Sequence, residues 1–284
     1  QNYPRGEKEL LGPFHQFMPG DTIAWFEERG VALKIEEDGR IFPASNSSQT
    51  IVDCFLNEAD KYRVDVLYSH SLKSLKHEDG LFQLDTSKGH FLAKKVVIAT
   101  GSSTKMWDLL EGLGHTVSKA VPSLFTFKIS DERIKDIPGV VAENVDVKLL
   151  GTNLYSEGPL LITHWGMSAP AILKLSAFGA IEIAKRAYRF KIEVNFIRQS
   201  FADCLNLLKN SKQELAKKSV LKSTPFNLPK RLWHQLVLAS HITEDARWAD
   251  INKLHLETLA KQLTQAQFNV CLLYTSPSPR DLKL

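Results

Sequence analysis

Several features that would place this chain in a common class are missing from its 284 residues. No stretch reaches the roughly 18 consecutive apolar residues that a membrane-spanning helix needs, so we expect no membrane partner. The first residues, QNYPRGEKEL, contain neither an initiating Met nor an apolar signal region, so we expect neither a secretion signal nor a natural start. The cysteines Cys54, Cys204 and Cys271 are far apart and odd in number, which predicts reduced thiols in a cytoplasmic protein.

Charge and motif content exclude further classes. The formal net charge of +4 is small, and no Lys/Arg run is interleaved with aromatic residues, so we expect no nucleic-acid partner. The histidines show no metal-ligand spacing, so we predict no metal site. No G-x-S-x-G, H-E-x-x-H or paired CxxC motif occurs, which argues against an α/β-hydrolase or a zinc enzyme. The 43% of hydrophobic side chains still suffices for a core and for more than one domain.

The last fourteen residues, CLLYTSPSPRDLKL, differ from everything before them, because Ser, Pro and Thr replace the helical periodicity. A disordered tail, common at chain ends, is one interpretation. The other starts from reverse translation: CLLYTSPSPRD matches a transposon-type sequencing adapter codon for codon. We favour the second interpretation, which makes 271–284 a non-native tail and leaves 1–270 as the genuine segment, cut at both ends.

Residues 1–118 carry mixed helix and strand patterns. Asp21 is placed to cap a short helix over 22–29 that Gly30 ends. A hairpin around Asp38-Gly39 follows, and then an amphipathic helix over 47–62 with Ser47 or Ser48 as its cap. The stretch 64–100 predicts four short strands, with turns at Asp79-Gly80 and Lys88-Gly89, and 105–114 predicts a helix that Gly112 or Gly114 closes. The fourth strand, VVIAT, is apolar throughout, so we expect it to be buried on both faces.

Strands dominate the middle of the chain and helices its C-terminal part. Strands are predicted at 122–129, 145–151, 159–164 and 191–197, with one helix over 170–188. From Arg198 to Gln267 the pattern is helical. We therefore predict an α/β protein in three parts, an α/β unit over 1–118, a strand-rich part over 119–197 and a helical subdomain over 198–270.

The first candidate site is KVVIATGSS, residues 95–103. A strand that ends in Ala99, Thr100 and Gly101 lets the backbone approach a ligand, because glycine has no side chain in the way. Ligands of open α/β sheets bind beyond the carboxyl ends of strands, where this segment points. An ordinary turn is the alternative.

The second candidate is GRIFPASNSSQ, residues 39–49. Arg40 on a hairpin arm could reach a phosphate or a carbonyl oxygen, Pro43 restricts the next turn, and Ser45 supplies a hydroxyl. An ordinary hairpin that leads into a helix cap explains the same residues.

The third candidate is LLITHWGMSAPAIL, residues 160–173, where an apolar run stops, turns at Gly166 and restarts. Ser168 is placed as a helix N-cap, with Pro170 in the first turn. The N–H groups of such a helix start favour an electron-rich partner, and His164 could donate a proton near neutral pH. A capped turn with a hydrogen-bonded histidine is the structural alternative.

Together these segments are far more specific than each is alone. Six segments follow one another along the chain: YPRGEK, WFEERGVALKIEEDGRIFPAS, VVIATGSS, GH with VPSLFTF, GPLLITHWGMSAPAILKLSAFGA and NLPKRLW. This order resembles the BaiN/YhiN-like family of FAD-dependent oxidoreductases, the aminoacetone-oxidase-like flavoproteins, over nearly all of 1–270. The resemblance implies a partial two-dinucleotide-binding-type FAD-binding domain over 1–118, part of an inserted β-barrel-like domain over 119–197 and a small helical subdomain over 198–270.

The resemblance also implies roles for particular residues. Cofactor-binding positions would be Arg40, Phe42, Pro43 and Ser45 near the flavin, Ala99, Thr100, Gly101 and Ser102 along the FAD cleft, and Gly166 where barrel and cofactor meet. His164 and Ser168 would lie at the same junction, and we predict both as catalytic residues. The family's G-x-G-x-x-G segment is absent, so we expect this chain to bind FAD poorly. Where the family has Ser-Gly-Pro, this chain has Ser168-Ala169-Pro170, which costs about 1 kcal/mol or more if φ at residue 169 is positive.

Three functions remain open at this point. The first is an FAD-dependent oxidoreductase that acts on a small organic substrate, with NAD(P)H or oxygen as redox partner. The second is a flavin-binding protein with a structural, sensory or partner-binding role. The third, association with nucleic acid as in distant tRNA-modifying flavoproteins, is disfavoured by the small net charge.

Overall fold

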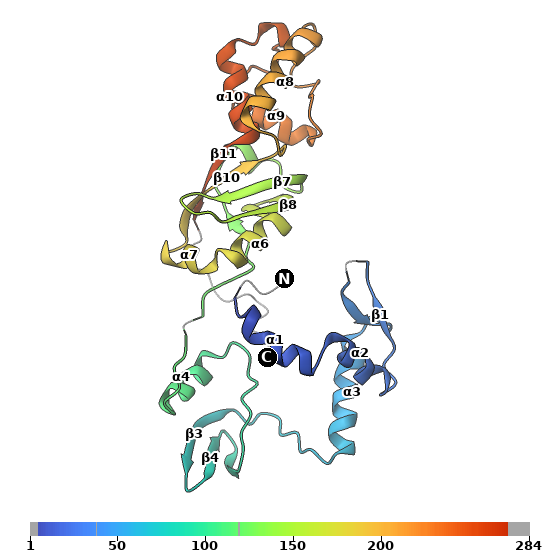
Figure 1. Cartoon of the computed structure of the whole chain (residues 1–284), viewed down its shortest axis with the longest axis vertical. Coiled ribbons are helices and arrows are strands. Elements are labelled where there is room, and N and C mark those ends of the chain that lie inside the picture. Colours follow the sequence, from blue (N-terminus) through green and yellow to red (C-terminus); the bar gives the residue numbers. More distant parts are fainter. Residues whose placement is uncertain (1–4, 38, 119, 272–284) are drawn as a thin grey trace. The chain divides into compact units, whose positions relative to one another are not determined.

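A computed structural model describes residues 5–37, 39–118 and 120–271. The chain divides into two compact units, residues 1–119 and residues 120–284 (Figure 1). Each unit is a mixture of helices and strands. Most of the predicted non-native tail, 272–284, lies outside the described residues, as do Asp38 and Lys119.

The first unit contains four helices and two small sheets among its described residues. Its elements are α1 (Glu7–Gln16), α2 (Pro19–Glu27), β1 (Leu33–Ile35), β2 (Ile41–Pro43), α3 (Ser48–Lys61), β3 (Leu72–Glu78), β4 (Leu81–Thr86), β5 (Gly89–Ala93) and α4 (Thr104–Gly112). Strands β1 and β2 form an antiparallel hairpin, and β3, β4 and β5 form a three-stranded antiparallel meander.

The start of α2 differs from the prediction that Asp21 caps it. The N-cap is Met18, and Asp21 is the third helical residue, whose carboxylate accepts a hydrogen bond from the Met18 N–H at 2.7 Å. Pro19 takes the first helical position, where its missing N–H costs nothing, so the helix begins three residues earlier than expected. Gly30 ends the helix as predicted, with φ of 78° and its N–H on the Glu27 carbonyl.

The hairpin and the amphipathic helix that follow it are confirmed. In the hairpin, Leu33 pairs with Pro43 and Ile35 with Ile41. The Ser47 hydroxyl caps α3 by accepting a hydrogen bond from the Gln49 N–H. Helix α4 ends at Gly112, and Gly114, with φ of 89°, closes its last turn.

The prediction of a fourth strand over VVIAT, buried on both faces, is wrong for this structure. Residues 95–100 have no regular secondary structure, and Val97 is 88% exposed. An apolar segment becomes a buried strand only when neighbouring strands pair with its backbone. Among the described residues, every strand pair is antiparallel and none involves this segment.

The second unit is built on a six-stranded sheet. Its elements are β6 (Phe127–Lys128), α5 (Glu132–Lys135), β7 (Val141–Leu149), β8 (Tyr155–Thr163), β9 (Gly166–Ser168), α6 (Pro170–Phe178), α7 (Ala180–Lys185), β10 (Arg189–Asn195), α8 (Phe201–Glu214), α9 (Lys230–Leu238), the 3₁₀ turn η1 (Trp248–Asp250), α10 (Lys253–Thr264) and β11 (Ala266–Cys271). The strand order is β11-β10-β7-β8-β9-β6, antiparallel throughout.

This sheet is nearly closed, because its first and last strands, β11 and β6, approach each other. The Phe127 ring of β6 lies edge-on to Phe190 of β10 at 5.1 Å, which closes the interior. Helix α6 lies against β8, and α8, α9 and α10 gather at one end of the sheet (Figure 1).

Three of the four strands predicted for this part of the chain are present as β7, β8 and β10, whereas only Phe127–Lys128 of the strand predicted over 122–129 form a strand, β6. Two further strands and a break were missed: β9 has only three residues, and β11 alternates apolar and polar residues but begins inside the stretch predicted to be helical. The single helix predicted over 170–188 is interrupted at Gly179. A Cβ there would lie 2.9 Å from the Leu175 carbonyl oxygen, which explains a glycine at the joint.

The helical part completes one continuous core with the sheet. Trp233 and Trp248 stack at 6.5 Å and are fully buried, and each indole N–H donates a hydrogen bond, to the Val220 carbonyl and to Ser223. Cys204 is also fully buried, and burial raises the pKa of its thiol to about 12. Among the described residues, no helix is both long and apolar enough to cross a lipid bilayer.

Candidate functional site

The segment 160–173 forms a hairpin followed by a helix. Strand β8 ends at Thr163, the chain turns through His164 and Trp165, and β9 begins at Gly166, which pairs with Thr163. The sequence interpretation placed a helix directly after the turn; the structure inserts the three-residue strand β9 first. The two turn side chains are exposed, Trp165 by 63%, and their ring centroids are 6.3 Å apart.

Gly166 is required by a close approach of two strands. A Cβ at this position would lie 2.0 Å from the Phe127 carbonyl oxygen and 2.7 Å from the Ile129 N. The residue is buried, and its φ of 151° suits glycine. Gly166 therefore lets β9 seat against β6, and this packing accounts for the glycine without any ligand.

Ser168 does not cap α6, contrary to the prediction. It is the last residue of β9, and its hydroxyl lies 2.9 Å from that of Thr126, the residue just before β6. The N-cap is Ala169, whose side chain accepts nothing. Because α6 begins at Pro170, Ser168 lies one residue too early to be its N-cap, and its hydroxyl contacts Thr126 instead.

Ala169 has a backbone conformation that glycine normally adopts. Its φ is 78° and its ψ is 175°, a region in which a Cβ costs of order 1–3 kcal/mol. This is the positive-φ case anticipated for Ser168-Ala169-Pro170. The chain therefore carries local strain at the junction of hairpin and helix.

The start of α6 offers few free donors. Pro170 has no N–H, and the N–H groups of Ile172 and Leu173 both donate to the Ala169 carbonyl at 3.0 Å. Ala171 is fully buried beside Gly158 of β8. The exposed chemistry of this region is thus on the hairpin tip, at His164, rather than at the helix start.

The segment 39–49 forms an exposed hairpin arm that leads into α3. The Arg40 guanidinium lies 5.3 Å from the centre of the Phe42 ring, a cation–π arrangement, and Phe42 is 40% exposed. Pro43 closes the hairpin opposite Leu33. The Ser45 hydroxyl contacts Thr50 at 2.7 Å and accepts from the Ser47 N–H, so it stabilises the entry to α3.

The segment 99–103 is an exposed turn ahead of α4. Ala99, Thr100, Gly101 and Ser102 are all exposed. Gly101 has φ of 61°, and nothing lies within 4 Å of the position that its Cβ would take. The next helix, α4, has Ser103 as N-cap without any side-chain hydrogen bond. As at α6, two N–H groups of the first turn, those of Met106 and Trp107, donate to the N-cap carbonyl, here that of Ser103. The N–H groups of Thr104 and Lys105 are left without a partner among the described residues.

The structure joins some predicted site residues and leaves others apart. It places Arg40 against Phe42, His164 beside Trp165, and Ser168 against Thr126, so Ser168 is not hydrogen-bonded to His164. Residues 40–45 and 99–102 belong to the first unit and 164–168 to the second. The FAD cleft along residues 99–102 and the meeting of barrel and cofactor at Gly166 stay predictions.

Two threonines near the hairpin were missed by the sequence analysis. Thr126 holds Ser168 across 42 residues of sequence, and the Thr163 Oγ1 is buried without a hydrogen-bond partner among the described residues. Sequence spacing carries no signal for either, because both depend on strands that meet only in the folded sheet. Within the described part of the chain, no group of three His, Cys, Asp or Glu side chains could hold a metal ion.

Comparison with known protein families identifies the family to which this chain belongs. The family described as "HI0933-like protein Rossmann domain" matches residues 1–219. The chain belongs to the HI0933-like family. This is the family of BaiN/YhiN-like flavoproteins that the order of motifs resembles, so that resemblance is confirmed.

Individual relatives of this HI0933-like chain carry different names. A 3-dehydro-bile acid delta(4,6)-reductase of Clostridium scindens is 24% identical over 86% of this chain and 64% of its own length. A protein of Haemophilus influenzae named ribosomal RNA dihydrouridine synthase is 23% identical over 87% of this chain and 62% of its own. Its namesake from Escherichia coli is 27% identical over 90% and 63%. The chain thus spans a little under two thirds of these curated relatives.

Proposed function

We propose that the protein to which this chain belongs is an FAD-dependent oxidoreductase that acts on a small organic substrate, with NAD(P)H or oxygen as redox partner. The match to the HI0933-like Rossmann domain over 1–219 carries the proposal. Rossmann-type domains hold dinucleotide cofactors, and a relative of this chain is named a reductase.

The turn at 99–103 fits a phosphate-bearing cofactor. Its backbone is exposed, the space beside Gly101 is empty, and no side chain caps α4. Uncapped first-turn amides at a positive helix end favour anionic oxygens. Thr100 and Ser102 would add hydroxyl donors on either side of Gly101, and Arg40 would supply a positive charge from the hairpin arm.

The hairpin tip would supply proton chemistry. When bound, a flavin accepts or donates a hydride equivalent. His164 is exposed, and an imidazole side chain can give a proton to a reacting group or take one. Gly166 and the Ser168–Thr126 contact hold the β8–β9 hairpin in place and thereby position His164.

The test uses the complete protein with FAD. Stopped-flow mixing of the oxidised form with NAD(P)H, and of the photoreduced form with oxygen, measures both half-reactions. We expect turnover, and we expect His164→Ala to slow one half-reaction at least tenfold with FAD still bound, within the range for general acid–base catalysis. His255→Ala is the control, because His255 lies on α10 outside the predicted site.

Two outcomes would contradict this proposal. Unchanged rates of both half-reactions in His164→Ala would remove His164 from the mechanism. Absence of turnover in the wild-type protein with either partner would favour a flavin-binding protein with a structural, sensory or partner-binding role.

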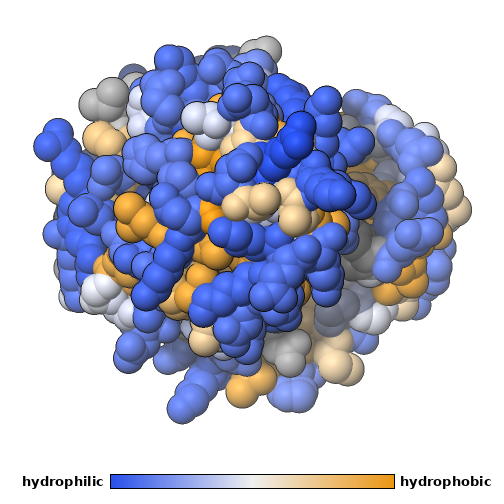
Figure 2. Space-filling view, turned by 90° about the horizontal axis from the view of Figure 1, so that it is seen from above, coloured by the Kyte–Doolittle hydropathy of each residue, from blue (hydrophilic) through white to orange (hydrophobic). Residues whose placement is uncertain are grey.

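A second candidate is reduction of a base in RNA. Two relatives are named ribosomal RNA dihydrouridine synthase. Residues 120–270 hold 20 Lys and Arg against 14 Asp and Glu, a net charge of +6. Five exposed lysines gather over 209–230: Lys209, Lys217, Lys218, Lys222 and Lys230. The surface at the α8–α10 end is predominantly hydrophilic (Figure 2).

RNA binding by this candidate would depend on salt, because lysines that contact phosphates release counterions. Fluorescence anisotropy with a short uridine-containing RNA should show affinity falling as salt rises. Combined replacement of Lys217, Lys218 and Lys222 by Ala should reduce the salt slope, while replacement of Lys61, Lys73 and Lys88 in the first unit should not. A salt-independent affinity would contradict the candidate.

A further inference from the structure

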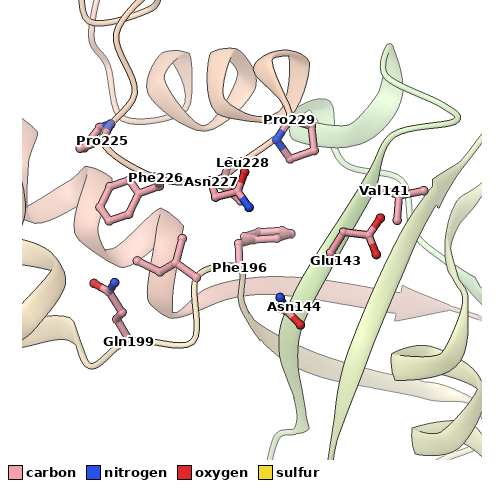
Figure 3. Close-up of a pocket in the computed structure, with 11 residues that line it drawn as sticks. Val141, Glu143, Asn144, Phe196, Gln199, Pro225, Phe226, Asn227, Leu228 and Pro229 are labelled. Carbon is pink, nitrogen blue, oxygen red and sulfur yellow. The ribbon is translucent and has the colours of Figure 1, made fainter.

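The second unit contains a cavity of about 470 Å³ that none of the predicted site residues lines. Three segments form it: Val141 to Asn144 of β7, Phe196 to Gln199 between β10 and α8, and Pro225 to Pro229 ahead of α9 (Figure 3). Its volume lies within the roughly 300–1,000 Å³ that is usual for small-molecule sites. All three segments belong to one compact unit, so the cavity is a property of that unit alone.

A gap in the sheet creates this cavity. Along β7, strand β10 pairs with Asp146–Leu149 and with no earlier residue. The chain then leaves the sheet at Phe196, whose N–H donates a hydrogen bond to the Leu263 carbonyl. The first half of β7 therefore has no neighbour on that edge. The unpaired edge of β7 forms one wall, in a place where the sheet would otherwise continue.

A β-bulge turns two polar side chains of β7 toward this gap. Ala142 pairs with Leu160 and Val145 with Gly158, so Glu143 and Asn144 together oppose the single residue Pro159 of β8. Proline has no N–H for the ladder, which explains why the bulge forms at this point. Bulges redirect side chains and are frequent beside binding sites.

The wall opposite β7 is aromatic, apolar and stiff. Phe196 and Phe226 are buried, and Leu228 is 9% exposed. The segment begins with Pro225 and ends with Pro229, whose rings restrict the backbone. Figure 3 shows Phe196 between this segment and the β7 side chains. Such a surface favours a flat, rigid ligand, which loses little conformational freedom on binding.

Four polar side chains line the cavity: Glu143, Asn144, Gln199 and Asn227. Glu143, Asn144 and Asn227 are exposed, and Gln199 is half-buried. None of these four side chains hydrogen-bonds to another of the described residues. Their three amides can both donate and accept, and the Glu143 carboxylate can only accept.

The charge of the lining selects against anions. Among the described residues that line the cavity, none is Lys, Arg or His, and the one charged group is the Glu143 carboxylate. A phosphate or carboxylate ligand would meet this negative charge without a cation to offset it. The ligand must instead offer N–H groups to Glu143 and both donors and acceptors to the amides.

We propose that this cavity binds an uncharged planar ring whose edge carries both N–H and C=O groups, as a nucleobase or a related cyclic amide does. The aromatic and proline wall would contact the ring face, and Glu143 with the amides of Asn144, Gln199 and Asn227 would read its edge. This inference does not depend on a flavin or on the hairpin at 163–166.

The test is titration of the full chain with uracil, followed by NMR of the side-chain amides and by calorimetry. We expect saturable binding with shifts of the Asn227 and Gln199 side-chain NH₂ signals. 1,3-Dimethyluracil keeps the ring but lacks the N–H groups, so it should bind at least about fivefold more weakly than uracil. Benzoate, a flat anion, should not compete with uracil.

Variants locate the binding. Asn227→Ala and Gln199→Ala should each weaken uracil binding about fivefold. Asn269→Ala and Gln213→Ala are matched controls, since both residues are exposed and lie outside the cavity lining. Glu143→Gln keeps the shape but removes the charge, so it should admit benzoate. Each variant's far-UV circular dichroism checks that the fold is intact.

Three results would overturn the proposal. The first is the absence of saturable uracil binding to the wild-type chain up to the solubility limit. The second is equal affinity for uracil and 1,3-dimethyluracil, which would show that the edge is not read. The third is binding that Asn227→Ala and the control Asn269→Ala weaken equally, which would place uracil elsewhere.

Discussion

The two units of this chain, residues 1–119 and residues 120–284, differ in where their apolar side chains lie. In the first unit only Val31, Cys54, Leu75 and Met106 are buried hydrophobic residues among those described. In the second, one cluster extends from Phe127 to Val270 through sheet and helices alike. Apolar content alone therefore does not produce a core; the segments must also have partners with which to bury it.

Helix α3 illustrates the difference. Its apolar face is well formed in sequence, yet Val52, Phe55 and Leu56 are 46%, 54% and 39% exposed. Helix α6 of the second unit is shorter and richer in aliphatic residues, and its Ile172 and Leu175 are fully buried on the side of β8. An amphipathic helix gains most of its stability from the surface it covers, and the described residues of the first unit offer α3 little such surface.

The units also differ in charge. Residues 1–119 hold 14 Lys and Arg against 17 Asp and Glu, a net charge of −3, whereas residues 120–270 carry +6. The small total of +4 hides this asymmetry. Net charge is thus informative here only after the domains are separated, and the expectation of no nucleic-acid partner rested on the undivided value.

The sharpest way to probe the contrast is to add one methyl group to a glycine of each unit. Gly166→Ala places a Cβ against the Phe127 carbonyl and the Ile129 N, so we expect a loss of about 3 kcal/mol or more in unfolding free energy. Gly101→Ala meets no atom within 4 Å and suffers only from its positive φ, so about 1 kcal/mol should be lost. Urea denaturation measures both, and equal losses would contradict the packing role of Gly166.

A pair of leucine truncations tests the cores directly. Leu175→Ala in α6 removes a fully buried side chain and should cost about 2–5 kcal/mol. Leu56→Ala in α3 removes one that is 39% exposed and should stay within about 0.5–1 kcal/mol. Unit-specific probes in thermal unfolding separate the two transitions. A cost for Leu56→Ala as large as that for Leu175→Ala would show that α3 is buried in solution.

The strain at Ala169 predicts a gain in stability. Ala169→Gly removes a Cβ from a conformation with φ of 78°, which outweighs the added freedom of glycine in the unfolded chain, so we expect stabilisation by about 1 kcal/mol. Ala171→Gly, two residues on and inside α6, should instead destabilise by about 1 kcal/mol. If Ala169→Gly also destabilises, the backbone at this junction is not strained.

The smallest expected difference between the units is in how their free energy of unfolding changes at low pH. Burial opposes ionisation of Asp131, but hydrogen bonds from Arg133 outweigh it and hold the pKa of Asp131 below its usual range. The resulting stability is fully present above the unfolded pKa of about 3.9 and is lost as pH falls through the lower folded value. Asp131→Asn should therefore flatten the acid limb of unfolding of the second unit.

Asp85 is the counterpart in the first unit. A hydrogen bond from Ser74, with a second contact from His90, lowers the pKa of Asp85 in the same direction. Because Asp85 is 47% exposed and His90 86%, solvent screens the interaction. Asp85→Asn should change the acid limb less than Asp131→Asn does, and 0.5 M salt should remove only the part of the Asp85 effect that comes from the charge of His90. A larger effect of Asp85→Asn would contradict this ranking.

Sequence reasoning predicted elements well where the signal is local. The β1–β2 hairpin, α3 with its Ser47 cap and the strands β7, β8 and β10 all follow from residues within one element. The predictions were wrong where residues distant in sequence determine the local structure. VVIAT has no neighbouring strand among the described residues, and Ser168 lies in a strand instead of capping a helix. Close packing at Gly179 interrupts the predicted helix. The prediction that Asp21 caps α2 was wrong for a local reason, because the helix already begins at Pro19.

For the candidate site, the sequence suggested which residues to consider, but it did not predict which other residues surround them in the fold. The exposed turn at Gly101 and the exposed His164 suit the predicted roles, which stay predictions. The cavity beside the β7 bulge carries no motif, because it arises where β10 leaves the sheet and three separate segments meet. Its four unpaired polar side chains look like ordinary surface residues in the sequence.

The sequence by itself determined the family, through an order of motifs along the chain, together with the local helices, turns and alternating strands that short-range preferences dictate. Only the tertiary structure decided which apolar faces are buried, that residue 169 has a positive φ, and that an open cavity lies beside a bulged strand. The physical reason is the range of the interactions. Caps, turns and periodicity act within a few residues, whereas burial, strand pairing and steric exclusion depend on segments that meet only when the chain has folded.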